Sequence, residues 1–204
     1  MKKNHYLLFI FCFLLGSVLL WGCGGGSPGS PGSKGDLGTN VTITEVTHDY
    51  LDEDIQWQVD IVQDICTGGT PEDFSDDFAV FSFESTPLNP NSTRTPGNIH
   101  VGKYTVEFFP MTLGAPPIEK LEAGGSGYMF TIPGNGTIAD IEILVLDVGR
   151  KVETSNAIIQ GLYTPQRIPV QYDMWITFSG QNDYGEDFRL QWHTPILLAD
   201  YDNC

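Results

Sequence analysis

Basic residues are scarce in this chain, which has 10 Lys and Arg against 26 Asp and Glu and a formal net charge of −16. All of the acidic residues follow Cys23, whereas two of the basic residues, Lys2 and Lys3, precede it. An acidic surface repels the phosphates of nucleic acids and anionic lipid head groups. We therefore exclude nucleic acid as a partner and attribute the acidity first to solubility.

The motifs of familiar catalytic machinery are also missing, since no H-E-x-x-H, C-x-x-C or P-loop occurs. The segment 134–139 matches G-x-G-x-x-A, but Pro133 precedes it and a β-rich run follows it. This context predicts a hairpin turn rather than a dinucleotide site, which needs a strand before it and a helix after it. His48, His100 and His193 stand apart in the sequence and do not predict a zinc site.

Long apolar runs are absent after residue 20. The run from Tyr6 to Leu20 follows two lysines and is shorter than the roughly 20 residues of a membrane span, so it predicts a signal peptide. Leu20-Trp21-Gly22-Cys23 resembles the lipobox of bacterial lipoproteins. The resemblance implies cleavage after residue 22 and a lipid on Cys23, although Trp21 stands where a smaller residue is commoner. The alternative is an ordinary cleaved signal followed by an unmodified Cys.

The next segment, 24–33, contains only Gly, Ser and Pro and predicts a flexible tether. We expect a signal peptide at 1–22, a lipidated tether at 23–39 and one folded domain at 40–204. The position directly after Cys23 holds Gly24 rather than Asp, and in this the chain resembles lipoproteins that are sorted to the outer membrane. The lipid anchor then makes the membrane a partner of the protein, while the leaflet that the domain faces stays open.

Cysteine is rare in the expected mature chain. Cys12 leaves with the signal and Cys23 carries the lipid, so Cys66 and Cys204 remain. In an oxidising envelope two remaining cysteines favour a disulfide, which would tie an early strand to the last residue. A free thiol and an intermolecular bridge are the alternatives.

Strand-like alternation dominates the chain after residue 40. It predicts strands at 41–46, 55–62, 78–83, 100–109, 128–132, 138–148, 172–178 and 188–198, separated by turns rich in Pro, Gly, Asn and Asp. One short helix is expected at 157–163 or within 71–77. About eight strands at this spacing predict an all-β sandwich or barrel.

Residues 174–180, the turn at 182–185 and residues 188–192 resemble the closing hairpin of immunoglobulin-like and fibronectin-like modules of bacterial surface proteins. The chain after Cys23 is also similar to a loose set of uncharacterised envelope lipoproteins, in its acidic segment 72–76 and its terminal segment 200–204. These resemblances imply an immunoglobulin-like antiparallel β-sandwich and no particular activity.

Calcium is the one ligand that the acidic loops suggest. Two loops place several carboxylates close together in sequence, and Ca²⁺ collects six to eight oxygen ligands. Neither loop has the spacing or the Gly of an EF-hand loop, so solvated acidic loops are the alternative. The candidate ligands are Asp49, Asp52, Asp54, Asp73, Asp76 and Asp77.

These features together predict a non-enzymatic binding or structural module of the cell envelope, with an envelope protein or a polysaccharide as its partner. The alternative is a carbohydrate-binding or carbohydrate-active domain, because acidic residues abound and Trp57, Trp175 and Trp192 could stack on sugar rings. Tryptophans at alternating strand positions are more often part of a core. An exposed row of aromatic residues would favour the alternative.

Overall fold

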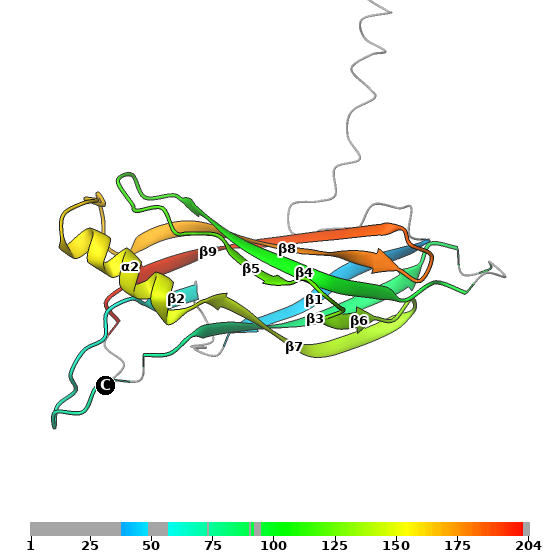
Figure 1. The fold of residues 1–204 in the computed structure, drawn as a ribbon, viewed down its shortest axis with the longest axis horizontal. Helices are drawn as coiled ribbons and strands as arrows, with labels where there is room; N and C mark the ends of the chain where they lie inside the picture. The colour runs from blue at the N-terminus through cyan, green and yellow to red at the C-terminus, as the bar shows by residue number, and fades with distance from the viewer. Residues whose placement is uncertain (1–37, 49–56, 73, 90, 92–94, 202–204) are drawn as a thin grey trace, which may run out of the picture.

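The computed structural model describes residues 38–48, 57–72, 74–89, 91 and 95–201. Two β-sheets pack face to face in two layers, and one helix lies at an end of them (Figure 1). The prediction of an all-β sandwich is confirmed. None of the helices within the described ranges has the length and apolar character needed to cross a membrane.

The smaller sheet has three strands in the order β1-β3-β7, and both pairings are antiparallel. Its strands are β1 (Thr39–His48), β3 (Asp77–Pro87) and β7 (Gly136–Leu146).

The larger sheet has six strands in the order β2-β9-β8-β4-β5, with β6 also paired to β4. Its strands are β2 (Trp57–Asp60), β4 (Ile99–Pro110), β5 (Leu121–Gly124), β6 (Phe130–Ile132), β8 (Val170–Asn182) and β9 (Asp187–Ala199). The antiparallel expectation holds for every pairing here except β2 with β9, which is parallel. No hairpin joins these two strands, so β2 can add to the sheet edge in this direction.

Aromatic side chains fill the space between the sheets. Phe81 and Phe83 of β3 are fully buried, whereas Val80 points to the other face, as alternation predicts. Phe178 of β8 meets both phenylalanines edge to face, with ring centroids 5.2 and 5.3 Å apart. Such contacts add about 0.5–1.5 kcal/mol per pair to the free energy of burial.

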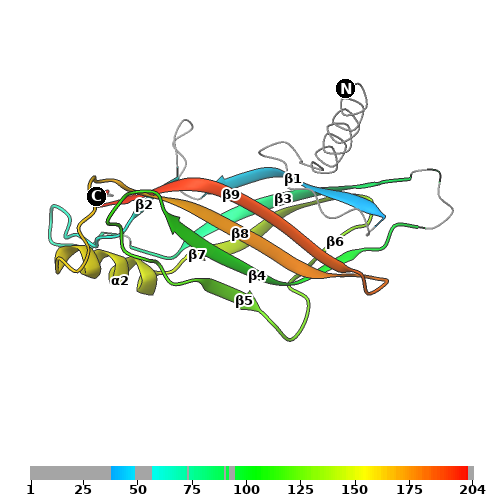
Figure 2. The same ribbon diagram turned by 90° about the horizontal axis from the view of Figure 1, so that it is seen from above.

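The sandwich has two distinct ends (Figure 2). At the turn end, the β8–β9 turn lies beside the start of β4, and the Asp183 N–H donates to the Asn98 carbonyl at 3.0 Å. β1 also begins there, because the buried Thr39 hydroxyl donates to the Gly134 carbonyl at 3.0 Å. The helix and the last described residues lie at the opposite, helix end. Thr39, predicted as tether, is therefore part of the fold.

The helix α2 (Val148–Ile159) begins earlier than predicted, and the segment 71–77 holds no helix among its described residues. Asp147 caps it by accepting a hydrogen bond from the Arg150 N–H at 2.9 Å. The β-branched and apolar residues before Asp147 suggested that the strand continued to 148. It ends at Leu146 because the cap starts a helix directly after it.

Two further segments differ from the expectations. β5 was not predicted, because its four residues are too few to show a period. The turn at Gly134 does connect two strands, but it is not a hairpin: β6 belongs to the larger sheet and β7 to the smaller one. It carries the chain from one layer to the other.

Candidate functional site

An aromatic and ionisable cluster lies on the outer face of the six-stranded sheet, the face turned away from the core. On β8, Met174 and Ile176 are buried in the core, so Trp175 between them points outward. Trp175 is paired across the sheet with Glu107 of β4 and His193 of β9. We call Trp175, His193, Asp173 and Phe109 the sheet-face cluster.

The side chains of the sheet-face cluster orient one another. The Trp175 indole and the His193 ring are stacked, with centroids 4.6 Å apart and planes 16° apart. One carboxylate oxygen of Asp173 accepts from the indole N–H at 2.7 Å, and the other lies 3.0 Å from His193 Nδ1. The Phe109 ring meets the indole edge to face at 6.3 Å and is half exposed. The indole is therefore held in a fixed orientation at the surface.

The β8–β9 hairpin sets this arrangement. Asn182 builds its turn by accepting hydrogen bonds from the N–H groups of Tyr184 at 3.0 Å and Glu186 at 2.9 Å. Once this turn fixes the register, Trp175 lies opposite His193, because one register runs along the whole hairpin.

The cluster leaves several groups available to a ligand. His193 uses Nδ1 for Asp173, and Nε2 makes no hydrogen bond within the described part of the chain. Its side chain is 50% exposed. The same face carries the partly exposed Gln191, whose side chain donates to the buried Thr177 hydroxyl at 3.1 Å. The face thus presents an apolar ring surface bordered by donors and acceptors.

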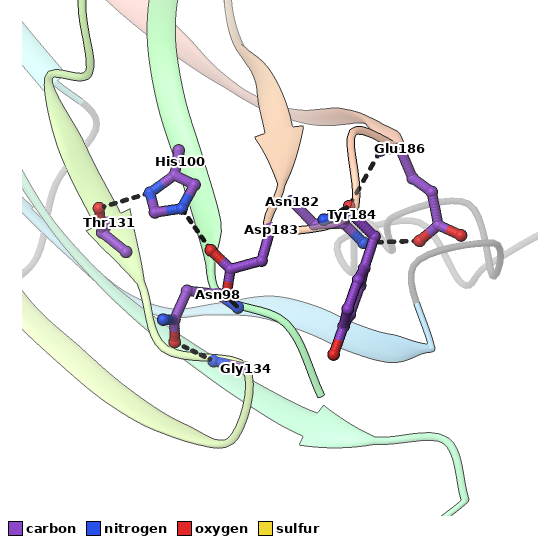
Figure 3. Close-up of polar contacts among 8 residues, drawn as sticks. All are labelled: Asn98, His100, Thr131, Gly134, Asn182, Asp183, Tyr184 and Glu186. Atoms are coloured by element: carbon purple, nitrogen blue, oxygen red, sulfur yellow. Dashed lines mark hydrogen bonds and ion pairs between the residues drawn. The ribbon is translucent and has the colours of Figure 1, made fainter. Parts of the chain in front are cut away.

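A second cluster of similar composition lies at the turn end (Figure 3). Both nitrogens of His100 are used: Nδ1 lies 3.0 Å from the Thr131 hydroxyl and Nε2 lies 2.7 Å from an Asp183 oxygen. Tyr128 stacks on the imidazole with centroids 4.4 Å apart. We call His100, Asp183, Thr131 and Tyr128 the turn-end cluster.

The turn-end cluster joins segments that are far apart in the sequence. The second oxygen of Asp183 accepts from the Asn98 N–H at 2.8 Å, and the Asn98 side chain accepts from the Gly134 N–H at 3.2 Å (Figure 3). The hydrogen bond from His100, aided by the Asn98 N–H, lowers the pKa of Asp183 below its usual value. Every polar group of the histidine and aspartate side chains is used in the fold, which assigns the turn-end cluster a structural role.

The candidate calcium ligands are only partly within the described residues. Asp49, Asp52, Asp54 and Asp73 lie outside them. Asp76 accepts from the Val148 N–H at 2.8 Å, at the start of α2. Asp77 is buried and forms an ion pair of 2.9 Å with Lys151 of α2. In the described ranges no three His, Cys, Asp or Glu side chains gather as a metal-binding group. Calcium binding stays a prediction.

The predicted disulfide lies partly outside the described residues, because Cys204 is among those not described. Cys66 lies in the turn between β2 and β3. The chain's last described residue, Tyr201, donates its N–H to the Asp60 carboxylate at 3.3 Å. Asp60 is six residues before Cys66, and the pairing of Cys66 with Cys204 stays a prediction. Cys23 and the signal peptide also lie outside the described residues.

The three tryptophans considered as sugar-stacking residues fall into two groups. Trp57 and Trp192 pack against the core and contact each other with ring centroids 5.4 Å apart. Trp175 lies on the opposite face. The sequence holds a signal for this difference, because Trp175 shares its strand face with the polar residues Asp173 and Thr177, two positions away on either side. The sequence favoured a surface or half-buried strand histidine over a zinc ligand at His193, and its stacking on Trp175 was not predicted.

The helix end holds a small pocket of about 90 Å³ between α2 and the segment 116–119. Arg150, Glu153 and Tyr163 are among its lining residues. Pockets for cofactors and drug-sized ligands measure roughly 300–1,000 Å³. This pocket is therefore too small for such a ligand, and the sheet-face cluster is the better candidate site.

No family model and no curated protein matches the chain. One solved structure, described as "X-ray structure of Northeast Structural Genomics Consortium target SoR45", is similar with a TM-score of 0.35 and 14% sequence identity. The match covers 80% of this chain and 89% of that one.

Proposed function

We propose that this protein is a lipid-anchored, non-enzymatic binding module of the bacterial envelope that holds its partner on the outer face of the six-stranded sheet. The observation that carries the proposal is the position of Trp175. A large aromatic side chain on a solvent-facing sheet, oriented by Asp173 and stacked on His193, is typical of binding surfaces.

The geometry of the domain supports an anchored role. The first described strand begins at the turn end, so a tether from Cys23 would join the domain there. Trp175 lies midway along β8, and the side chains of His193 and Phe109 beside it are half exposed. A partner could then reach the sheet face while the turn end faces the membrane.

The form of the site supports binding rather than catalysis. Electrostatic catalysis is strongest in sites from which water is excluded. The sheet-face cluster is open, and His193 and Phe109 are each half exposed. An open surface with oriented side chains supplies contact area and specificity instead.

The anchor is tested by changing Cys23→Ala in the full chain. The wild-type protein should incorporate labelled palmitate and sediment with membranes, and the variant should do neither. Wild-type protein that takes up no palmitate would contradict the lipoprotein assignment while leaving the binding role open.

The binding face is tested by site-specific photo-cross-linking in intact envelopes. A photoreactive residue at Glu107, which is paired with Trp175 across the sheet and has a side chain 41% exposed, should give an adduct that disappears in a Trp175→Ala background. The matched control places the same residue at Glu45, which is exposed on β1 of the other sheet. Adducts of equal yield at both positions, independent of Trp175, would overturn the proposal.

A further inference from the structure

We propose that the sheet-face cluster is a stacking site for an uncharged pyranose ring, so that the partner of this face is a neutral polysaccharide. This inference rests on the proposed binding function of the same face. It is carried by the geometry of Trp175, His193 and Asp173 and by the distribution of charge around them.

The aromatic surface suits the apolar face of a sugar ring. The C–H groups of a pyranose pack on an indole, and an indole fixed before binding loses little conformational entropy when the sugar arrives. Asp173 and His193 fix Trp175 in this way. The Phe109 ring, 6.3 Å from the indole, extends the apolar surface along the sheet.

The polar groups beside the rings suit sugar hydroxyls. A carboxylate offers about four acceptor positions, and Asp173 uses its two oxygens for one contact each. His193 Nε2 and the Gln191 side chain lie on the same face. Neighbouring outward rows on a strand are about 7 Å apart, so the rows at Asp173 and Trp175 could contact adjacent sugars of one chain.

The local charges select for a ligand without negative charge. Glu107 and Glu122, two further carboxylates on this face, are both within ion-pair distance of Lys120. Asp173 has no lysine or arginine partner among the ion pairs of the described residues. With a chain net charge of −16, an anionic polysaccharide would be repelled.

The turn-end cluster provides a matched control. Tyr128 also stacks on a histidine that is bound to an aspartate, and it is 70% exposed. Its histidine, however, has no free ring nitrogen. Tyr128→Ala therefore removes an exposed aromatic residue of similar surroundings without touching the proposed site.

The test uses the detergent-solubilised full-length protein and five probes: maltohexaose, cellohexaose, mannohexaose, chitohexaose and the anionic hexagalacturonate. We expect at least one neutral hexasaccharide to bind by calorimetry and to change the tryptophan emission, and hexagalacturonate to give no signal. Trp175→Ala should weaken binding about tenfold or more, Trp175→Tyr should retain part of it, and Tyr128→Ala should leave it unchanged.

Each alternative result has a definite meaning. Binding of none of the neutral hexasaccharides, or equal loss in Trp175→Ala and Tyr128→Ala, would overturn the inference. If the sugars do not bind but the Glu107 adduct in envelopes still depends on Trp175, the saccharide inference fails and the binding function stands. If the adduct is also missing, both fail.

Discussion

The two aromatic–histidine–aspartate clusters have nearly the same parts and different connections. At the turn end, His100 and Asp183 use all their polar atoms on groups from other segments, including Thr131 and the Asn98 backbone. On the sheet face, the Asp173 carboxylate is hydrogen-bonded, within the described residues, to Trp175 and His193 of the same hairpin. The first cluster holds segments together, whereas the second orients side chains that point to solvent.

The difference shows how a structural contact can be separated from a binding site without homologous sequences. A group that is saturated by distant backbone partners contributes to folding. A side chain that is oriented only by its neighbours in sequence or on the sheet, and that keeps one hydrogen-bonding atom unused, can be removed with little change in the free energy of unfolding. If this distinction is correct, substitutions in the turn-end cluster lower the free energy of unfolding more than substitutions in the sheet-face cluster.

The largest effect is expected from the predicted disulfide. Changing Cys66→Ser or Cys204→Ser should lower the free energy of unfolding by about 2–5 kcal/mol, because the unfolded chain gains freedom. The double variant should be no worse than either single one. Urea unfolding measures the change, and a thiol assay of the denatured, unreduced protein should find no free Cys66 or Cys204. Two reactive thiols would contradict the pairing.

The next effect comes from a buried acid at the helix end. Burial and a hydrogen bond with Glu72 raise the pKa of Asp60 to about 6. Because an unfolded aspartate has a pKa near 4, the folded state favours the protonated form. Below about pH 4 the protonated Asp60 makes its full contribution to the free energy of unfolding. This contribution, on the order of 2 kcal/mol, is lost as the pH rises through about 6.

Asp60→Asn tests this contribution, since the amide oxygen can still accept from the Val62 and Tyr201 N–H groups. The variant should lose the decline in unfolding free energy between pH 4 and pH 6. Identical pH profiles for the variant and the wild type would show that Asp60 titrates normally in the fold.

A smaller effect separates the two histidines directly. His100→Ala should lower the free energy of unfolding by about 1–2 kcal/mol, because it leaves Thr131 and Asp183 without their partner. His193→Ala should change it by less than about 0.5 kcal/mol. Denaturant unfolding of both variants measures the difference, and equal losses would break the comparison between the clusters.

The smallest effect concerns the stability of the fold at acidic pH. Because His100 lowers the pKa of Asp183, this carboxylate stabilises the fold above the pKa of unfolded aspartate, and the contribution is lost as the pH falls. Wild-type protein and Asp183→Asn should therefore differ near neutral pH and converge as the pH falls below the usual pKa of aspartate. Melting temperatures across this range test the convergence. Curves that stay parallel would show that the ionised form is not favoured.

The sequence predicted most strands because burial of one face imposes a period of two residues. In β3 this period places Phe81 and Phe83 on one face, and both are buried in the fold. The same period places Trp175 on a polar face of its strand. The sequence alone favoured a core position for Trp175 instead, because tryptophan is usually buried. Local hydrogen bonding ended the run before α2, where the cap at Asp147 overrides β-propensity.

The contacts between distant segments could not be predicted in the same way. The Lys151–Asp77 ion pair and the Asn98–Asp183 contact join residues 74 and 85 positions apart, and no period in the sequence reports such pairs. The free nitrogen of His193 is equally invisible, because it depends on which ring atom faces Asp173. The register of the hairpin thus determines which residues of the candidate site are neighbours. The contacts between their side chains, which the sequence does not report, determine its chemistry.

The antiparallel pairing of β1 with β3 has a mechanical consequence. β1 begins at the turn end, and its hydrogen bonds to β3 run across the strand direction from Thr39 to His48. A pull on Thr39 from an anchored tether, resisted by a partner on the larger sheet, would act along the strand. All of these hydrogen bonds would then bear the load in shear together, rather than opening one after another like a zip.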